Sequence, residues 1–401
     1  MKVLQVSLSN IGGGASKIVS DLHDKLLFKG IDSELLIFEG KSSAKVKCIN
    51  DTFYKKYTFR LKNLVSKLIL NLFINKSYDC RSINLFPSSL AEYINNSDAD
   101  IVHFHWIGAE MISIKQIGYI NKKIIWTLHD AWALNGTYHI NPNDYLVDSD
   151  FTVDLSNFFE KYVYKKKVKY LANKNIIFTS PSRWLLKKYS VSFYSKINTR
   201  CFLIHNFIDL SIWFPIGKQE ARNQLSIKSN KKIIVFGANN ALTSFNKGYN
   251  FIKELMSIIP KEIYCFLIFG NNDDLAIENN GVECIFKGKV KDQNLLRLIY
   301  SAGDFTIVPS LSESFSLVSL ESIACNTPVL AFNTSGIKDI VSHKKNGFLA
   351  KKFDINSLRE GLFWLSNNQL LNINVSVTKF SKDFVINQFI DLYNQESTIF
   401  L

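Results

Sequence analysis

Short apolar runs recur along the first half of the chain, and stretches with helical spacing separate them. The runs lack the strict alternation of apolar and polar residues that marks a half-exposed strand, so we expect strands with both faces buried. Buried strands joined by helices, such as the helix that we expect at Lys17–Lys29, form open parallel sheets. The expected strands are Val3–Val6, Leu35–Phe38, Ile101–His105, Ile124–His129, Ile176–Phe178 and Phe202–Ile204.

The same plan starts again in the second half of the chain. Polar residues and Pro215 interrupt the pattern near His205–Gln219, and 401 residues suffice for two or three domains of roughly 100–200 residues each. The sequence predicts an α/β chain of two doubly wound, Rossmann-like domains, residues 1–206 and 207–378, that face each other across a central cleft. The expected strands of the second domain are Ile233–Phe236, Phe266–Phe269, Ile285–Phe286, Phe305–Val308 and Val329–Phe332.

The composition, with 47% hydrophobic and 21% charged residues, is typical of a globular protein. No run approaches the roughly 18 apolar residues of a membrane-spanning helix, and Met1–Ser7 is typical of a strand rather than of a secretion signal. None of the six cysteines has metal-ligand or Cys-x-x-Cys spacing. We therefore expect a cytoplasmic protein without disulfides.

The net charge of +13 is concentrated in the first half, where residues 1–200 hold 28 Lys and Arg against 17 Asp and Glu. Within it, Lys55–Lys76 interleaves basic residues with apolar residues at helical spacing. A basic amphipathic helix indicates binding to an anionic membrane surface. The alternative is a helix packed on the core with a solvated basic face. No nucleic-acid-binding motif is present, so we expect no nucleic-acid partner.

Three glycines follow the first expected strand, and histidines follow two others. Gly12, Gly13 and Gly14 precede a helix, where glycine lets the backbone approach a ligand and the helix N-terminus favours an anion. A tight turn explains them equally well. His129 stands at the end of its strand beside tryptophans, as suits a sugar with its hydroxyls and apolar faces. Zinc is an alternative because His103, His105 and His139 share this half, but ligand-spaced Cys, Asp and Glu are missing, so we expect no metal.

In the second half, Gly237 ends a strand, and Lys247 opens the next helix, where it can meet a phosphate. A strand is expected to end at Val308, with Glu313 in the loop after it and Glu321 in a helix that starts near Ser314. Eight helical steps of about 1.5 Å separate two carboxylates by roughly 12 Å, which exceeds the roughly 5 Å of a retaining glycosidase pair. The spacing fits a long ligand with hydroxyls at both ends and an anion between them, held by the amides of Ser314, Phe315, Ser316 and Leu317.

These motifs together resemble retaining glycosyltransferases of family 4, which have the GT-B fold. The resemblance rests on the glycine loop at residues 12–14, His129, Lys247-Gly248, the Glu-x7-Glu of Glu313 and Glu321, the linker Asn206-x-x-Asp209 and Pro328-Val329. Segment Thr127–Tyr138 is similar to bacterial enzymes that build capsule, O-antigen or exopolysaccharide.

The resemblance implies metal-independent hexosyl transfer with retention, from a UDP- or GDP-linked sugar to a lipid-linked saccharide, with no cofactor. It implies that the first domain binds the acceptor and the second the donor. Glu313 would contact the transferred sugar, Glu321 the ribose, and Lys247 the distal phosphate together with the amides of residues 315–317. His129 would lie at the donor sugar, and the glycine loop would close over phosphates and acceptor.

The resemblance also implies that a last segment, residues 379–401, crosses back to the first domain, packed by Phe380, Phe384, Phe389 and Tyr393. With its basic half, the protein would lie at the inner face of the cytoplasmic membrane. One departure is Ala238, where the family usually has an arginine for the diphosphate. It favours one alternative, a binding subunit that partners an active transferase. A sugar-nucleotide epimerase on the same fold is a second, independent alternative.

Overall fold

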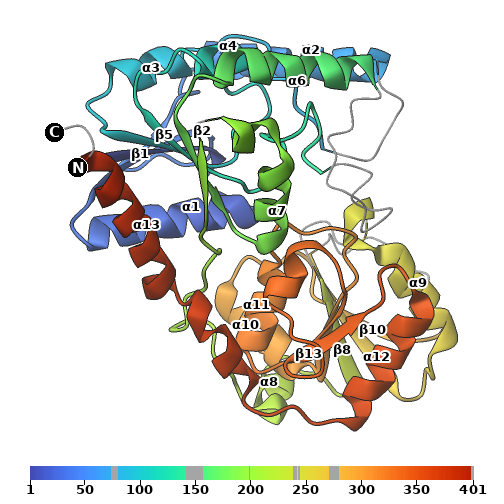
Figure 1. Cartoon of the computed structure of the whole chain (residues 1–401). Coiled ribbons are helices and arrows are strands. Elements are labelled where there is room, and N and C mark those ends of the chain that lie inside the picture. Colours follow the sequence, from blue (N-terminus) through green and yellow to red (C-terminus); the bar gives the residue numbers. More distant parts are fainter. Residues whose placement is uncertain are drawn as a thin grey trace. The chain divides into compact units, whose positions relative to one another are not determined.

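The computed structural model describes residues 1–73, 80–140, 157–197, 199–237, 242, 244–270 and 280–398. The chain forms two compact units, Met1–His205 with Ile386–Leu401 and Asn206–Val385. It leaves the first unit after His205 and re-enters it within helix α13 (Lys382–Thr398) (Figure 1). The second unit therefore extends beyond residue 378, where the sequence pattern placed its end.

The described part of the first unit contains a seven-stranded sheet in the order β3-β2-β1-β4-β5-β6-β7, with every neighbouring pair parallel. In register, Val3 pairs with Ser33 on one side and with Ile101 on the other. The strands are β1 (Lys2–Ser9), β2 (Asp32–Glu39), β3 (Val46–Cys48), β4 (Ile101–Phe104), β5 (Lys123–Thr127), β6 (Ile176–Ser180) and β7 (Arg200–Leu203).

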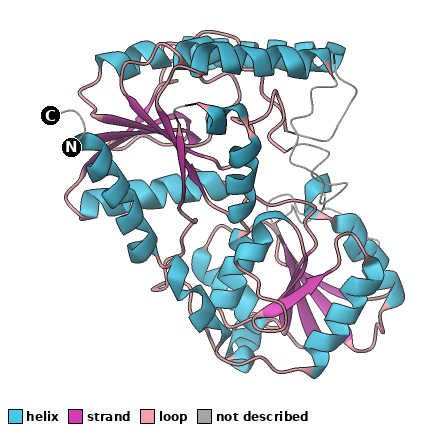
Figure 2. Cartoon of the chain, in the orientation of Figure 1, coloured by secondary structure: helices cyan, strands magenta, loops and turns pink. Residues whose placement is uncertain are grey.

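Helices cover both faces of this sheet (Figures 1 and 2). α2, α3, α4 and α6 lie on one side, and α1 and the end of α13 lie on the other. Residues from β1, β4, β5 and β6 are buried between these layers, as expected for strands without strict alternation. The bounds are α1 (Gly14–Phe28), α2 (Phe53–Phe73), α3 (Leu90–Asn96), α4 (Ile114–Ile117), α6 (Phe158–Leu171), α7 (Arg183–Val191) and the 3-10 turn η1 (Phe193–Lys196).

The described part of the second unit contains a six-stranded parallel sheet in the order β10-β9-β8-β11-β12-β13. Separate apolar clusters cover its two faces. The strands are β8 (Lys232–Gly237), β9 (Tyr264–Phe269), β10 (Glu283–Phe286), β11 (Phe305–Val308), β12 (Val329–Phe332) and β13 (Gly347–Ala350). The helices are α8 (Lys218–Gln224), α9 (Tyr249–Ile258), α10 (Gln293–Ala302), α11 (Leu317–Ala324) and α12 (Ile355–Asn367), with 3-10 turns η2 (Phe245–Lys247), η3 (Ser335–Asp339) and η4 (Ile373–Phe380).

These two sheets confirm the predicted α/β architecture, with differences at strand ends and sheet edges. The sequence pattern missed β3 and β13, which lie at the edges of the two sheets and are three and four residues long. β4 and β5 end at Phe104 and Thr127, so His105 and His129 lie in the loops beyond them rather than in strands.

The C-terminal aromatic residues divide between the units. Phe389 and Tyr393 are buried in the first unit, where Tyr393 hydrogen bonds to His103. Phe380 instead packs on Phe315 within the second unit, and Phe384 is exposed. The prediction that all four aromatics pack on the first domain was therefore wrong for Phe380 and Phe384, because the chain returns to that unit only at residue 386.

Among the described residues, no helix has both the length and the apolar character needed to cross a bilayer.

Candidate functional site

The glycine loop of the first unit connects β1 to α1 with left-handed backbone. Gly12 and Gly13 have φ of +77° and +62°, and a Cβ built on either would have no heavy atom within 4 Å. α1 begins at Gly14, with Gly13 as its N-cap residue. The backbone angles alone account for these two glycines. The open space beside them also leaves room for a ligand at the helix N-terminus.

His129 lies just beyond β5 and ends a chain of three polar side chains. Nε2 of His105 is 2.6 Å from Oε1 of Gln5 on β1, and Nδ1 of His105 is 3.0 Å from Nε2 of His129. Gln5 and His105 are buried, and His129 is half-buried. A buried chain of this kind fixes the orientation of each ring.

Burial keeps these histidines neutral near pH 7. It lowers the pKa of His129 to about 4, with Asp130 opposing the shift. It also lowers the pKa of His105, and that of His103 to about 3. An imidazole that stays neutral can both donate and accept a hydrogen bond, which suits a hydroxyl-bearing ligand.

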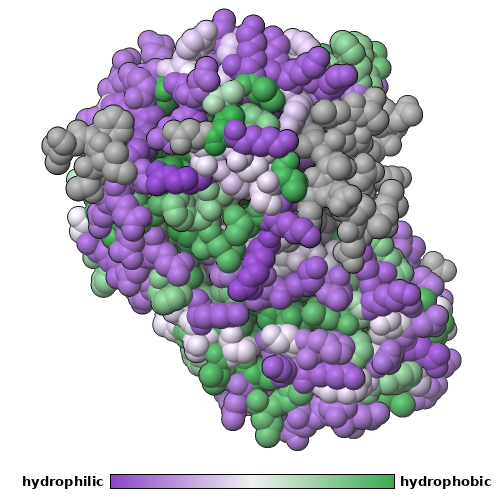
Figure 3. Space-filling model, in the orientation of Figure 1, coloured by the Kyte–Doolittle hydropathy of each residue, from purple (hydrophilic) through white to green (hydrophobic). Residues whose placement is uncertain are grey.

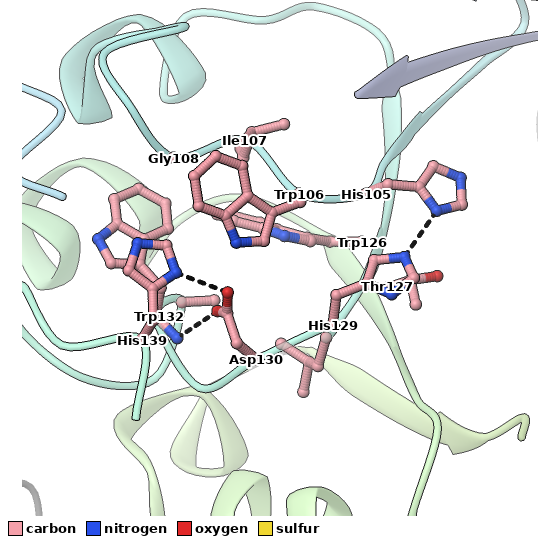
Figure 4. Close-up of a pocket in the computed structure, with 12 residues that line it drawn as sticks. His105, Trp106, Ile107, Gly108, Trp126, Thr127, His129, Asp130, Trp132 and His139 are labelled. Atoms are coloured by element: carbon pink, nitrogen blue, oxygen red, sulfur yellow. Dashed lines mark hydrogen bonds and ion pairs between the residues drawn. The ribbon is translucent and has the colours of Figure 1, made fainter. Parts of the chain in front are cut away.

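A small hollow opens beside His129 (Figure 4). It is at the carboxyl ends of β4 and β5, where parallel sheets bind ligands. Three tryptophans contribute to its wall, so it offers apolar faces next to polar atoms, as a sugar requires. The lining residues are His105, Trp106, Ile107, Gly108, Trp126, Thr127, Leu128, His129, Asp130, Trp132, Ala133 and His139.

The loop that follows His129 is held by a second hydrogen-bonded chain, which the sequence did not reveal. Nδ1 of His139 is 2.6 Å from Oδ2 of Asp130, and its Nε2 is 2.8 Å from Oγ of Ser82. The Trp132 N–H donates to Oδ1 of Asp130 (Figure 4). Burial alone would raise the pKa of Asp130, but His139 and the Trp132 N–H hold it below its ordinary value. These hydrogen bonds fix the position of Asp130, the residue next to His129.

A buried lysine completes this support. Nζ of Lys167 donates to the backbone oxygens of Trp132, Asn135 and Gly136, and it lies 3.8 Å from the centroid of a Trp132 ring. Burial lowers its pKa well below the ordinary value. In the sequence Lys167 is one of three consecutive lysines, Lys165–Lys167, and in the structure its side chain holds the loop from the buried side.

In the second unit, the structure brings Lys247 and Glu313 together. Nζ of Lys247 is 2.7 Å from Oε1 of Glu313, and both side chains are partly exposed. Lys247 ends η2, and Glu313 lies in the loop after β11. The Glu313 N–H donates to Oγ of Ser335, and its carbonyl accepts from the Gly336 N–H. The cation and the carboxylate are therefore both held at the carboxyl end of the sheet.

Asn246 is a positioning residue that sequence reasoning missed. Its Nδ2 donates to the Ser312 carbonyl, its Oδ1 accepts from the Ser312 N–H, and its carbonyl accepts from the Leu311 N–H. Next to it, Gly248 has φ of +71°, and a Cβ there would lie 2.0 Å from the Pro309 carbonyl oxygen. The turn that carries Lys247 is thus fixed directly on the loop that carries Glu313.

Glu321 lies in α11 and is buried. Its Oε2 is 3.2 Å from the hydroxyl of Tyr300, whose pKa is raised by burial and by this carboxylate. The sequence placed Glu313 and Glu321 on one strand–loop–helix, and the structure keeps that order. The expected separation of the two carboxylates assumed helical steps throughout, whereas Glu313 lies in the loop that precedes the helix.

The start of α11 is later than the expected Ser314. The helix begins at Leu317, and the Ser316 side chain caps it by accepting from the Ser319 N–H. Serine with extended backbone is a preferred N-cap, which explains the shift. Ser314 and Phe315 therefore precede the helix, and the Phe315 side chain is buried in the apolar core of the second unit. Any anion at this point would meet backbone N–H groups.

Gly237 ends β8, where a Cβ would lie 2.5 Å from the Phe269 ring. Packing alone thus explains this glycine. It lines a small hollow together with Lys247 and Glu313. Ala238, where the expected arginine is missing, lies outside the described residues, as do residues 239–241.

The described residues contain no group of three His, Cys, Asp or Glu side chains that could hold a metal ion. His105 and His129 hydrogen bond to each other instead. The chain has Asp-x-Asp sequences at residues 98–100 and 148–150, the second of which lies outside the described part. Asp98 pairs with the Lys2 side chain and Asp100 with the Lys2 N–H, at the opposite end of β4 from the hollow.

Known proteins resemble this chain in sequence and in fold. Residues 217–383 match the family model described as glycosyl transferases group 1. An uncharacterized glycosyltransferase of Methanocaldococcus jannaschii is 28% identical over 185 residues, 41% of this chain and 52% of that protein. The chain spans about half the length of the first curated relatives that it matches. An uncharacterized 41.2 kDa protein in the cps region of Klebsiella pneumoniae is 21% identical over 98% of this chain and 99% of its own.

Two solved structures have the same fold over nearly the whole chain. Sucrose-phosphate synthase from Thermosynechococcus elongatus has a TM-score of 0.69 at 18% identity, covering 98% of both chains. HepE of Anabaena, in complex with UDP and glucose, has a TM-score of 0.68 at 14% identity, covering 98% of this chain and all of that one. The chain therefore has the GT-B fold, and its residues 217–383 match the glycosyl transferases group 1 family model.

Proposed function

We propose that the protein is a retaining glycosyltransferase of family 4 that moves a hexosyl group from a nucleotide-diphosphate sugar to a lipid-linked saccharide. The observation that carries this proposal is the pairing of Lys247 with Glu313, four residues before the start of α11, the helix that contains the buried Glu321. A cation, two carboxylates and a helix N-terminus thus lie at the carboxyl end of one parallel sheet, where ligands bind in such folds.

Each of these groups has a role in the proposed donor site. Glu313 accepts hydrogen bonds from hydroxyls of the transferred sugar, and Glu321 accepts from the ribose hydroxyls. The distal phosphate meets Lys247 and the backbone N–H groups of Phe315, Ser316 and Leu317. These N–H groups precede or begin α11, where the helix dipole favours an anion. Gly237 lets the nucleotide approach the end of β8.

In the first unit, His129 belongs to the proposed reaction centre and Gly12–Gly14 to the proposed acceptor and phosphate loop. The hollow beside His129 offers tryptophan faces and neutral imidazole, a surface for sugar rather than for phosphate. Gly12 and Gly13 have no neighbour that would block an incoming chain.

The proposed chemistry needs neither a metal nor a cofactor. The leaving diphosphate carries off negative charge, which Lys247 and the N-terminus of α11 stabilise in place of a metal cation. Retention follows if the acceptor hydroxyl gives its proton to a donor phosphate oxygen on the same face of the sugar, so that no protein base is required there.

The relatives suggest which substrates to try first. HepE of Anabaena has been crystallised with UDP-glucose, so we propose a UDP-linked donor, with a GDP-linked one as the alternative. The Klebsiella relative lies in a cps region, which favours a role in capsule, O-antigen or exopolysaccharide synthesis.

We further propose that the basic N-terminal half of the chain lies on the inner face of the cytoplasmic membrane, where a lipid-linked acceptor would be found. The support is α2, whose outer face is apolar and exposed. Leu64, Leu68 and Leu72 are 55%, 54% and 80% exposed. α2 has no acidic residue, and Arg60 and Lys67 flank the leucines. In Figure 3 the surface over α2 and α6 is mainly hydrophilic, with hydrophobic residues toward one end.

Calorimetry with UDP, GDP and CMP tests the donor site. We expect micromolar binding of one diphosphate and its loss in Glu321→Ala. Glu360 is an exposed residue of α12. Glu360→Ala removes a carboxylate of the same unit and should leave nucleotide binding unchanged. If no nucleotide binds, or if Glu321→Ala binds as wild type does, the assigned donor site is wrong.

Turnover separates the proposal from its alternatives. A binding subunit would bind the nucleotide without consuming a nucleotide sugar. An epimerase would convert the sugar without an acceptor. Transfer to a lipid-linked saccharide, with the anomeric configuration read by NMR, is the result that the proposal requires.

A further inference from the structure

The polar chain beneath His129 has a direction that the structure defines. Oε1 of Gln5 is 2.6 Å from Nε2 of His105, and Nδ1 of His105 is 3.0 Å from Nε2 of His129. The three residues come from β1 and from the loops after β4 and β5, all in the first unit. Within the described part of the chain, the His129 ring hydrogen bonds through Nε2.

An amide oxygen can only accept a hydrogen bond. The Gln5 side chain therefore determines which ring nitrogen of His105, and then of His129, carries the hydrogen. Nε2 of His105 must carry a hydrogen to donate to Oε1. A neutral imidazole has one N–H, so Nδ1 of His105 has a lone pair and accepts from His129. His129 then carries its hydrogen on Nε2, and its Nδ1 has the lone pair.

Both rings have to be neutral for this argument, and their surroundings keep them so. Burial lowers the pKa of each well below neutrality, and the neighbouring histidines lower that of His105 further. Gln5 and His105 are buried, which keeps water from replacing either hydrogen bond.

We propose that Gln5 and His105 are positioning residues that fix His129 as the Nε2–H tautomer, so that Nδ1 accepts a hydrogen bond from the ligand. A hydroxyl or amine fits such an acceptor, whereas an ionised phosphate, which has no donor, does not. The proposal deepens the proposed function: it assigns a sugar hydroxyl, rather than the diphosphate, to His129.

A second series of hydrogen-bonded side chains passes through His103, two residues before His105, and provides an internal control. Nδ1 of His103 is 2.7 Å from the Tyr393 hydroxyl, and its Nε2 is 2.7 Å from Oγ1 of Thr127. Thr127 continues to Thr179, so this chain runs beside the Gln5 chain and approaches it at Tyr393. Thr127→Val breaks it and leaves Gln5, His105 and His129 in place.

Tautomers are read directly from the imidazole nitrogens of protein labelled with 15N-histidine. The chain has seven histidines, and the His129 signal is identified by its loss in His129→Asn. In wild type at pH 7.5 we expect a protonated Nε2 and an unprotonated Nδ1 at His129. A protonated Nδ1 would overturn the proposal, and this measurement needs neither a substrate nor a further variant.

Two variants then test whether Gln5 sets the tautomer. Gln5→Met keeps the size but removes the acceptor, and we expect the second tautomer of His129 to become populated. Thr127→Val should change the His103 signals and leave those of His129 as in wild type. If His129 keeps its wild-type tautomer in folded Gln5→Met, Gln5 has no positioning role.

Kinetics separates this inference from the proposed function. With the donor that calorimetry selects, Gln5→Met should lower kcat about tenfold, the effect of one misplaced hydrogen bond, and change the donor KM by less than about threefold. Wild-type protein that shows the expected tautomer but no transfer would contradict the proposed function alone. Transfer by wild type at an unchanged kcat in Gln5→Met would contradict the inference alone.

Discussion

Lys247 and Glu313 form an ion pair, with Nζ 2.7 Å from Oε1, although 66 residues separate them in the chain. Asn246 holds the two segments together through the backbone of Ser312. In the proposed site, the Lys247 cation faces the phosphate and the Glu313 carboxylate faces the sugar. The ion pair therefore lies beside the sugar–phosphate bond that breaks in the reaction. Each partner also keeps the other in place before a ligand arrives.

Removing Lys247 should therefore mainly weaken UDP binding, whereas removing the Glu313 charge should mainly slow transfer. In Lys247→Met, the affinity for UDP should fall about tenfold to hundredfold, because a charge-assisted contact to phosphate is lost. In Glu313→Gln, UDP binding should stay within about threefold while transfer slows at least about tenfold. Calorimetry and initial rates measure these quantities. Uridine, which lacks the diphosphate, is the control ligand, and an equal loss of uridine affinity in Lys247→Met would contradict the phosphate role.

Gly248 should be intolerant of a side chain for a reason that Gly281 does not share. Both have positive φ, +71° and +79°, so alanine strains the backbone by about 1 kcal/mol at either position. A Cβ at Gly248 would also lie 2.0 Å from the Pro309 carbonyl oxygen, whereas at Gly281 the nearest atom is the Lys261 Cδ at 3.6 Å. Thermal unfolding should show a larger loss of stability for Gly248→Ala, together with weaker UDP binding. Equal losses would contradict the close approach to Pro309.

Much of the fold could be predicted because its strands are buried on both faces. An apolar run such as Ile233–Phe236 identifies β8 without any tertiary information. The edge strands β3 and β13 carry no such signal, since they are short and, in β3, half exposed. The start of α11 was predicted too early because Ser314 and Ser316 are both acceptable caps, and packing of Phe315 decides between them.

The candidate site was predictable residue by residue but not as a set of contacts. Spacing indicated Glu313 and Glu321, yet their partners Lys247 and Tyr300 lie 66 and 21 residues away along the chain. Gln5 lies 100 residues from His105 and has no feature of its own in the sequence. Such partners are set by which strands are neighbours in the sheet, and a single sequence does not reveal that order.

Acid should destabilise the first unit through its buried histidines. The folded pKa of His129 is about 4 and that of His103 about 3, below the ordinary 6.5, so the unfolded chain binds more protons between these values. Stability is therefore full above about pH 6.5 and is lost as the pH falls towards 4 and then 3, by up to about 3 kcal/mol for His129.

Urea unfolding at several pH values between 7.5 and 4.5 checks this direction. His103→Gln, which removes one of these groups, should lose less stability on acidification than wild type loses. His343→Gln removes an exposed histidine and should follow the wild-type curve. The assignment to His103 would be wrong if both variants showed the same pH dependence.

Membrane binding should depend on the leucines of α2 as well as on its charge. Replacing Leu64, Leu68 and Leu72 by serine removes apolar groups that are already exposed, so the fold should hold while binding to vesicles with anionic lipid falls.

Replacing Lys56, Arg60 and Lys67 by glutamine should weaken binding too, and added salt should weaken it in wild type. The matched control replaces exposed lysines of the second unit, Lys291, Lys345 and Lys351, with the same change in charge. Cosedimentation measures each protein. Equal losses in the control and in the α2 charge variant would mean that net charge, rather than this helix, attracts the protein to the bilayer. Unchanged binding in the serine variant would rule out insertion of the leucines.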